Sequence, residues 1–173
     1  MEFMDTVKKT GKAVEKAFMP SSQDEKDILD VLRTEHNEVK KLLSELVETT
    51  SAPTRKSLLK KIKLALVPHV RAEEKIVYDA IIAQKDKNEK TDGEEGYLEH
   101  DLADKMLATL GKISNAASPE FSAAAKVLKE LVEHHIEEEE SNVWKDVRNH
   151  FNADERIEMN RQFEIAKKKV RVA

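Results

Sequence analysis

The sequence contains no cysteine, and only four glycines and four prolines among its 173 residues. Without cysteine the chain has no disulfide, no thiolate nucleophile and no sulfur-ligated metal site, which suits a reducing compartment. Long hydrophobic runs are also missing: no stretch reaches about 18 apolar residues, and residues 1–19 lack the continuous apolar stretch of a signal peptide. We therefore expect a cytoplasmic protein with no stable membrane insertion.

Charged residues make up 37% of the chain, and aromatic residues only 5%. With so little glycine and proline, this composition is typical of long helices joined by few loops. The 30 basic and 34 acidic residues give a net charge of −4. That balance argues against a general nucleic-acid binder, so we expect no nucleic acid partner.

Helical spacing of apolar residues runs through the sequence. Ser22 stands three residues before Glu25, a capping-box pattern that predicts the start of the first helix. Pro68 falls inside the second helix and should bend it, because it cannot donate a hydrogen bond to the preceding turn. The segment "KDKNEKTDGEEG" is predicted to be the one clear loop. The later helices are predicted over residues 96–115, from Pro119 (capped by Ser118) to His150, and from Ala153.

Four main helices with short connections predict an all-α fold, an up-and-down antiparallel four-helix bundle with extra N- and C-terminal helices. The predicted units are an amphipathic helix over residues 1–20, a bundle over residues 22–151 made of two repeats (22–86 and 96–151), and a C-terminal helix over residues 153–173.

The two repeats are visible in the residues themselves. "TEHNEVKKLL" matches "LEHDLADKML", and "HVRAEEKIVYDAI" matches "HIEEEESNVWKDV". Each half thus supplies one histidine and then a His-x-x-x-Glu pair, and an aromatic residue, Tyr78 or Trp144, follows five positions after the glutamate. The six candidate site residues are His36, His69, Glu73, His100, His135 and Glu139.

These residues continue the apolar stripes of their helices. Residues four apart share one helix face, so each imidazole and carboxylate can reach the same point inside a bundle. A single buried histidine is usually a hydrogen-bonded core residue, but two buried carboxylates cost several kcal/mol each unless cations offset them. Six converging groups therefore predict bound metal, and nitrogen-plus-carboxylate ligands suit iron, manganese or zinc.

The fourth helix allows two frames, His134/Glu138 and His135/Glu139. The second frame continues an inward apolar row, whereas the first leads to Ser141, Asn142 and Lys145. We therefore favour His135/Glu139, and the first frame remains the alternative. The other acidic residues of this stretch are then predicted to lie on a solvated face: Glu137, Glu138 and Glu140.

The doubled pattern resembles the hemerythrin-like family of HHE cation-binding proteins over roughly residues 25–150. The resemblance implies a non-haem centre of two Fe ions, joined by an oxo or hydroxo bridge, inside a left-handed four-helix bundle. Glu73 and Glu139 would bridge the ions and the four histidines would be terminal ligands. Manganese or zinc is less expected.

The resemblance also implies a small-molecule ligand: O2, NO or peroxide. Oxygen-carrying hemerythrins have one more histidine, four residues after the position of His100, where this chain has Asp104. That departure argues against simple reversible oxygen carriage, and we expect an exposed or outer aspartate rather than a seventh ligand. The six-ligand form is similar to bacterial proteins tied to nitric oxide, oxidative stress and iron handling.

Two other functions remain open. One is a di-iron oxidase or oxygenase acting on an organic substrate, with residues 1–20 closing over the cavity. The other is a structural or signalling bundle stabilised by its metal. The sequence does not identify a protein partner.

Overall fold

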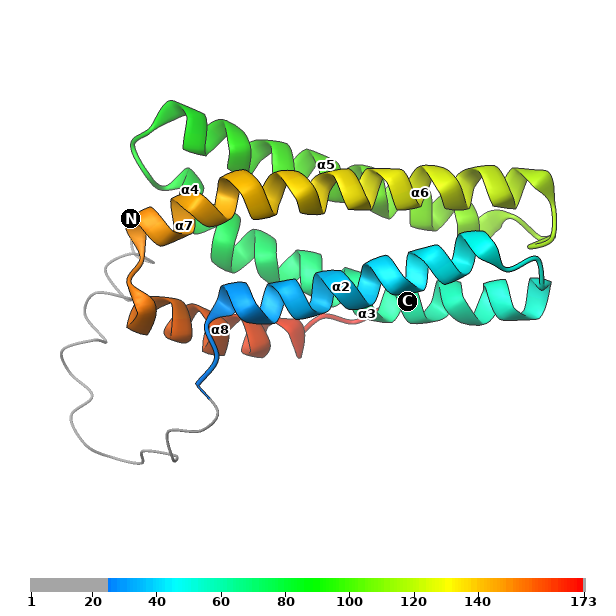
Figure 1. Cartoon of the computed structure of the whole chain (residues 1–173), viewed down its shortest axis with the longest axis horizontal. Coiled ribbons are helices and arrows are strands. Elements are labelled where there is room, and N and C mark those ends of the chain that lie inside the picture. The colour runs from blue at the N-terminus through cyan, green and yellow to red at the C-terminus, as the bar shows by residue number, and fades with distance from the viewer. Residues whose placement is uncertain (1–24, 173) are drawn as a thin grey trace.

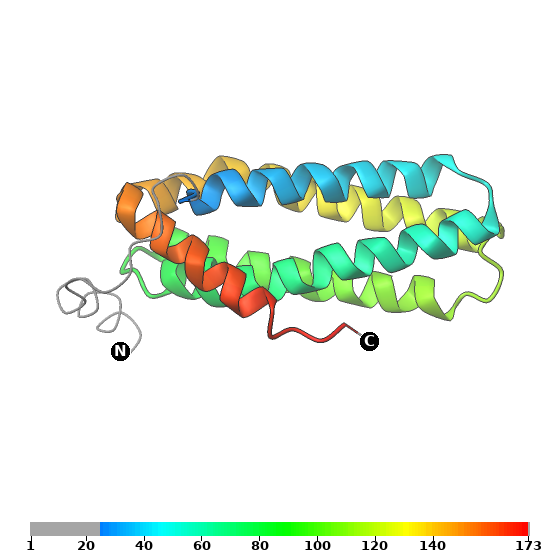
Figure 2. The same ribbon diagram turned by 90° about the horizontal axis from the view of Figure 1, so that it is seen from below.

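The computed structural model describes residues 25–172, and this part of the chain is helical with no β-strand. Long helical segments lie alongside one another, as Figures 1 and 2 show. In chain order the elements are α2 (Ile28–Glu48), α3 (Ala52–Glu73), η1 (Glu74–Tyr78), α4 (Asp79–Ile82), α5 (Lys87–Lys112), α6 (Pro119–Glu138), η2 (Glu139–Val143), α7 (Trp144–His150) and α8 (Ala153–Lys167). The all-helical prediction is confirmed. The predicted helix over residues 1–20 and the capping Ser22 lie outside the described residues.

The first described helix begins later than the capping-box pattern indicated. Asp27, not Ser22, caps α2: its side chain accepts a hydrogen bond from the backbone N–H of Leu29 at 3.0 Å. The other carboxylate oxygen of Asp27 accepts from Arg156 Nε at 2.7 Å, which ties α8 to the start of α2. The predicted cap Ser118 is present at the start of α6, and Asn152 caps α8, which begins at the predicted Ala153.

The predicted loop "KDKNEKTDGEEG" is wrong for most of its length, because α5 begins at Lys87. Asp86 caps the helix by accepting hydrogen bonds from the next backbone N–H groups. The two glycines of this segment are buried at helix contacts. A Cβ on Gly93 would lie 2.7 Å from the Ile82 side chain, and a Cβ on Gly96 would lie 2.6 Å from the Tyr78 ring. Glycine at these positions lets α5 approach α4 and η1 closely.

The helix that starts at Ala52 continues through Pro68. Its departure from α-helical geometry comes further on, in the π-helical segment η1, directly after Glu73. The second half has the same feature, because η2 begins at Glu139. Single π-helical turns inside α-helices often occur at functional sites. Here η1 starts directly after the glutamate of its His-x-x-x-Glu pair, and η2 starts at the glutamate of the second pair.

Two apolar clusters fill the interior, one on each side of a polar layer. Val39 and Leu66 belong to one cluster, and Leu32 and Ala72 belong to the other. His36 lies between Leu32 and Val39 on α2, and His69 lies between Leu66 and Ala72 on α3. The two packed clusters therefore fix the position of these two histidines along the helices.

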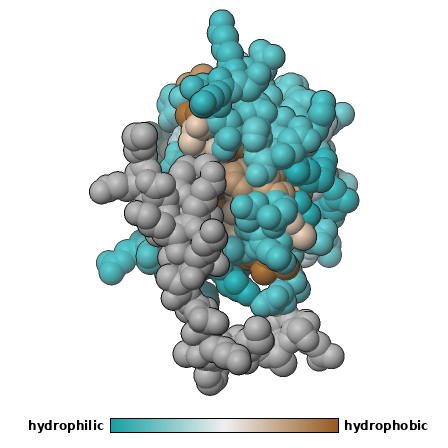
Figure 3. Space-filling model, turned by 90° about the vertical axis from the view of Figure 1, so that its left-hand side faces the viewer, coloured by the Kyte–Doolittle hydropathy of each residue, from teal (hydrophilic) through white to brown (hydrophobic). Residues whose placement is uncertain are grey.

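Figure 3 looks at the end of the molecule where α7 joins α8, and hydrophilic residues cover most of the described surface there, around a smaller hydrophobic area. Among residues 25–172, no helix is long and apolar enough to cross a lipid bilayer.

Candidate metal centre

The buried polar side chains of residues 25–172 are the six candidate residues and Arg55. Arg55 has ordinary partners, because it donates hydrogen bonds to the carbonyls of Thr49 and Ala116 and to the Ser122 hydroxyl. The six candidates converge on one another instead, from α2, α3, α5, α6 and the first residue of η2.

Each glutamate reaches one histidine from each half of the chain. Glu73 Oε2 lies 3.5 Å from Nε2 of His69 and 3.5 Å from Nε2 of His100. Glu139 Oε2 lies 3.3 Å from Nε2 of His36 and 3.9 Å from Nε2 of His135. The histidines themselves pair by half: the rings of His36 and His69 are 5.1 Å apart between centroids, and those of His100 and His135 are 4.6 Å apart.

This arrangement leaves buried polar atoms without hydrogen-bond partners within the described chain. They are His36 Nε2, both carboxylate oxygens of Glu73 and Oε2 of Glu139. A buried carboxylate oxygen with no donor is strongly unfavourable unless a cation lies beside it. Two sets of three residues each bring a ligand atom within 4.8 Å of one another: His36, His69 and Glu73, and Glu73, His100 and His135. The donors therefore fit metal ions, and Glu73 belongs to both sets.

Each of the four histidines also makes a hydrogen bond to a carboxylate through Nδ1, the ring nitrogen that faces away from the other candidates. Nδ1–H of His69 donates to Glu35 at 2.8 Å, and Nδ1–H of His135 donates to Glu99 at 2.6 Å. The other two histidines donate from Nδ1 to a glutamate of the opposite half of the chain. His100 donates to Glu74 at 3.1 Å, and His36 donates to Glu140 at 3.0 Å. A carboxylate on Nδ1 fixes the proton there and turns the Nε2 lone pair inward, as is usual for metal-bound histidines.

These four carboxylates correct one sequence prediction. Glu140 was predicted to lie on a solvated face, but it holds His36. A sequence signal was present, because the pairs Glu35–His36 and Glu99–His100 repeat, and so do the double glutamates at residues 73–74 and 139–140. These contacts join different helices, so the helix face on which each residue lies does not reveal them.

Comparison with known proteins agrees with this geometry. Residues 27–147 match the model of the hemerythrin HHE cation-binding domain. The chain belongs to this family. The match includes all six candidate residues and ends before α8, so in this HHE chain the last helix lies outside the matched region.

One relative is a protein named DNA nickase from Nostoc sp. (strain PCC 7120 / SAG 25.82 / UTEX 2576), which is 27% identical over 150 residues. The similarity covers 87% of this chain but only 42% of that relative, so the HHE chain spans less than half of the relative's length. No solved structure matches the chain.

The structure separates the two frames on the fourth helix of the HHE repeat. His135 is 8% exposed and Glu139 is 2% exposed, and both face the cluster. The side chain of His134 is 62% exposed, and its Nε2 lies 3.5 Å from Glu138 at the surface. The structure therefore brings the favoured pair together with the other candidates and leaves the alternative pair outside.

The two aromatic residues of the repeat are fully buried beside the centre. Trp144 Nε1–H donates to Glu139 at 3.4 Å, and its indole stacks on His36. The Tyr78 hydroxyl lies 3.4 Å from His135 Nε2. Burial, together with the negative charges of Glu139 and Glu73, raises the pKa of Tyr78 well above its ordinary value. The phenol therefore keeps its proton and remains a hydrogen-bond donor at the centre.

Without metal, protons partly compensate the charges of the centre. Burial alone would lower the pKa of His69, but the carboxylates of Glu73 and Glu35 outweigh it and raise that pKa to about 9. The pKa of Glu139 is raised well above its ordinary value by burial and by the charge of Glu73. The pKa of Glu73 is instead held low, since His69, a hydrogen bond with Glu139 and the charge of His36 outweigh the effect of its burial.

Asp104 lies outside the set of converging residues. Its side chain, 30% exposed, pairs with Arg71, and Arg71 also donates to Glu74 at 2.8 Å. Since Glu74 holds His100, Asp104 is connected to the centre only through Arg71 and Glu74.

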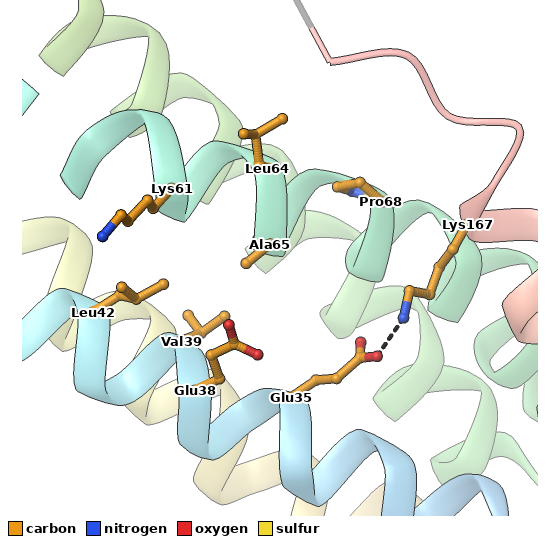
Figure 4. A pocket seen from close by; sticks show the side chains of 9 residues that line it. All are labelled: Glu35, Glu38, Val39, Leu42, Lys61, Leu64, Ala65, Pro68 and Lys167. Carbon is orange, nitrogen blue, oxygen red and sulfur yellow. Dashed lines mark hydrogen bonds and ion pairs between the residues drawn. The ribbon is translucent and has the colours of Figure 1, made fainter. Parts of the chain in front are cut away.

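Figure 4 shows a groove of about 550 Å³ between α2 and α3, with Lys167 of α8 at one end. Lys167 pairs with Glu35, the carboxylate that holds His69. None of the six candidate residues lines this groove. An organic molecule bound there would contact an outer carboxylate and not the converging donors, so the groove does not favour the oxidase alternative.

Proposed function

We propose that this chain is a non-haem di-iron protein that binds small oxidants (O2, NO or peroxide) inside an up-and-down antiparallel four-helix bundle, with a role in oxidative stress or iron handling. The observation that carries the proposal is that Glu73 and Glu139 each reach one histidine from each half. A carboxylate placed between two histidine pairs is suited to bridge two ions.

In this assignment His36 and His69 hold one ion, and His100 and His135 hold the other. Two nitrogens and two bridging carboxylate oxygens give each ion about four protein ligands, which leaves room for a small molecule. When bound, iron supplies the electrons and the vacant coordination positions that such chemistry needs. Ligands of this kind suit iron better than calcium or magnesium, which prefer oxygen alone.

The chain's own residues supply the rest of the site. The carboxylates behind the histidines keep their Nε2 atoms directed inward and increase their basicity. Tyr78 offers its O–H beside His135 as a hydrogen-bond donor to an entering molecule. The apolar layers on both sides exclude bulk water from the charges.

The test is to mix the reduced, iron-loaded protein with NO, O2 or hydrogen peroxide and to follow its absorption spectrum. We expect spectral changes with NO and oxidation by O2, both lost in Glu73→Ala together with the iron. Consumption of peroxide by the wild type would favour a detoxifying enzyme, whereas oxidation without turnover would favour a sensor. An iron-loaded protein whose spectrum responds to none of the three would contradict the proposal.

Hydrolysis of a phosphodiester bond is a second candidate, because the relative named DNA nickase is similar over 87% of this chain. Centres of two metal ions catalyse such reactions in other proteins. The carboxylates around the candidate centre would repel a phosphate backbone, so we rank this function second. Conversion of supercoiled plasmid to the open circular form by the metal-loaded wild type, but not by Glu73→Ala, would establish it.

A further inference from the structure

The two halves of the centre differ in what surrounds them. On the side of His69, the ring of Phe163 meets the imidazole edge-on at 5.8 Å, and Lys167 pairs with Glu35. Both belong to α8, which packs on α2 and α3 (Figures 1 and 2). In the second half, on the side of His135, His135 and Glu99 face a small cleft between α5 and the segment formed by α6 and η2.

The cleft runs from surface residues to the candidate ligands. Glu95 and Asn142 are exposed at its outer end, whereas His135 and Glu139 are buried at its inner end. Its volume is about 20 Å³, enough for a single water molecule or metal ion and little else. At the inner end, Oε2 of Glu139 is buried and has no hydrogen-bond partner in the described chain.

The walls of the cleft are acidic. The carboxylates that line it above Glu139 are Asp92, Glu95, Glu99 and Glu138, and no lysine or arginine among residues 25–172 lines it. Within residues 25–172, no basic side chain pairs with Asp92 or Glu95. Burial and the charges of Glu138, Asp86 and Glu89 raise the pKa of Asp92, as expected where carboxylates gather without cations.

The carboxylate behind His135 shows the same difference. Glu35 pairs with Lys167, and Glu74 pairs with Arg71. Glu99 is paired, in the described part of the chain, only with His135. Glu99 therefore lacks the lysine or arginine partner that Glu35 and Glu74 have, and its charge adds to that of the other carboxylates that line the cleft.

Two of the carboxylates that line the cleft, Glu99 and Glu138, form a group with the exposed His134, in which each residue brings a ligand atom within 4.8 Å of the others. Glu99 Oε2 already accepts from His135, so Glu99 connects this outer group to the inner ligands. An imidazole with two carboxylates suits divalent iron or manganese, and its exposure favours rapid exchange over tight binding.

We propose that this acidic cleft is the port through which divalent cations enter the centre, with Glu99, His134 and Glu138 as a transient outer site. The inference rests on the proposed metal centre. Clefts lined by one sign of charge raise the local concentration of ions of the opposite sign and their rate of entry. The unpartnered Glu139 oxygen at the inner end then provides the next ligand.

The test measures how fast the metal-free, full-length chain takes up Co²⁺, whose visible absorption reports binding in a stopped-flow instrument. The port variant is Glu95→Gln with Glu138→Gln. Its matched control is Glu94→Gln with Glu137→Gln, which removes the same charge from exposed neighbours on the same two helices. We expect the port variant to load roughly tenfold more slowly and with weaker salt dependence, at unchanged final stoichiometry, and the control to load like the wild type.

Equal rates in all three proteins, or equal slowing in variant and control, would overturn the port. Loss of final stoichiometry in the port variant would also overturn it, because these residues would then be permanent ligands. A wild-type chain that binds no metal at all would overturn the proposed function together with the port. A port variant that binds metal at the wild-type rate would overturn the port and leave the proposed metal centre standing.

Discussion

Nε2 of His100 and Nε2 of His135 lie 3.0 Å apart in the buried space between the helices. Because Glu74 and Glu99 hold the Nδ1 protons, the two nitrogens direct lone pairs at each other. Such a contact is repulsive unless a proton or a metal ion lies between the nitrogens. Metal–nitrogen bonds of about 2.1 Å at right angles would separate the nitrogens by about 3.0 Å. The distance therefore fits two ligands of one ion.

Metal binding should release protons. In the metal-free protein the pKa of His69 is about 9, so at neutral pH this imidazole holds a proton that a bound ion must displace, and the raised pKa of Glu139 favours a proton there as well. Apparent affinity should therefore rise with pH, about tenfold per pH unit for each proton released, up to the pKa of His69. Calorimetry in buffers of different ionisation enthalpy counts these protons. An affinity that stays flat from about pH 6 to about pH 8 would be evidence against protonated ligands.

Substitutions on the fourth helix distinguish the two frames. His135→Ala and Glu139→Ala should remove metal, because both side chains are buried among the converging donors. His134→Ala and Glu138→Ala should leave equilibrium metal content nearly unchanged, because these side chains lie at the surface. Metal analysis of the four purified variants checks this prediction. Retention of metal in the first pair and loss in the second would move the centre by one residue.

Removing the carboxylate behind a histidine should weaken metal binding without abolishing it. Glu140→Ala leaves Nδ1 of His36 without its acceptor, and loss of such partners typically costs about 10- to 100-fold in metal affinity. Glu137→Ala, an exposed neighbour on α6, is the matched control and should bind like the wild type. Competition with a chromophoric chelator measures both. Equal affinities in the two variants would show that the Glu140 contact has no role in metal binding.

The sequence predicts some of these features well and others poorly, for physical reasons. The repeat and the spacing of His69 and Glu73 depend on the period of one helix, which the sequence displays directly. The contact of Glu140 with His36 joins two helices that are distant in the chain, so local periodicity cannot show it. The two π-helical segments likewise have no evident local signal.

The start of α5 was missed because glycine has two uses. The segment "KDKNEKTDGEEG" contains two glycines, which are common in loops, but Gly96 is the place where a helix passes over the Tyr78 ring. Only the partner helix reveals which use applies.

Gly96→Ala should therefore destabilise the protein, because the added methyl would lie 2.6 Å from the Tyr78 ring. Overpacking of this kind typically costs about 1–3 kcal/mol. Gly111→Ala, in the same helix, meets only the end of Lys63 at 3.4 Å and should be neutral or stabilising by up to about 1 kcal/mol. Thermal unfolding of the two variants measures the difference. A Gly96→Ala protein as stable as the wild type would show that Tyr78 can move aside at little cost.

Iron content with an absorption spectrum, measured on protein expressed with iron and purified without chelator, tests the central claim most directly. The proposed centre predicts about two iron ions per chain, with near-ultraviolet charge-transfer absorption in the oxidised protein. His135→Ala and Glu139→Ala, which each remove one of the six candidate ligands, should lose both the iron and the absorption. A wild-type chain that contains zinc alone, or no metal after iron-supplemented expression, would contradict the account.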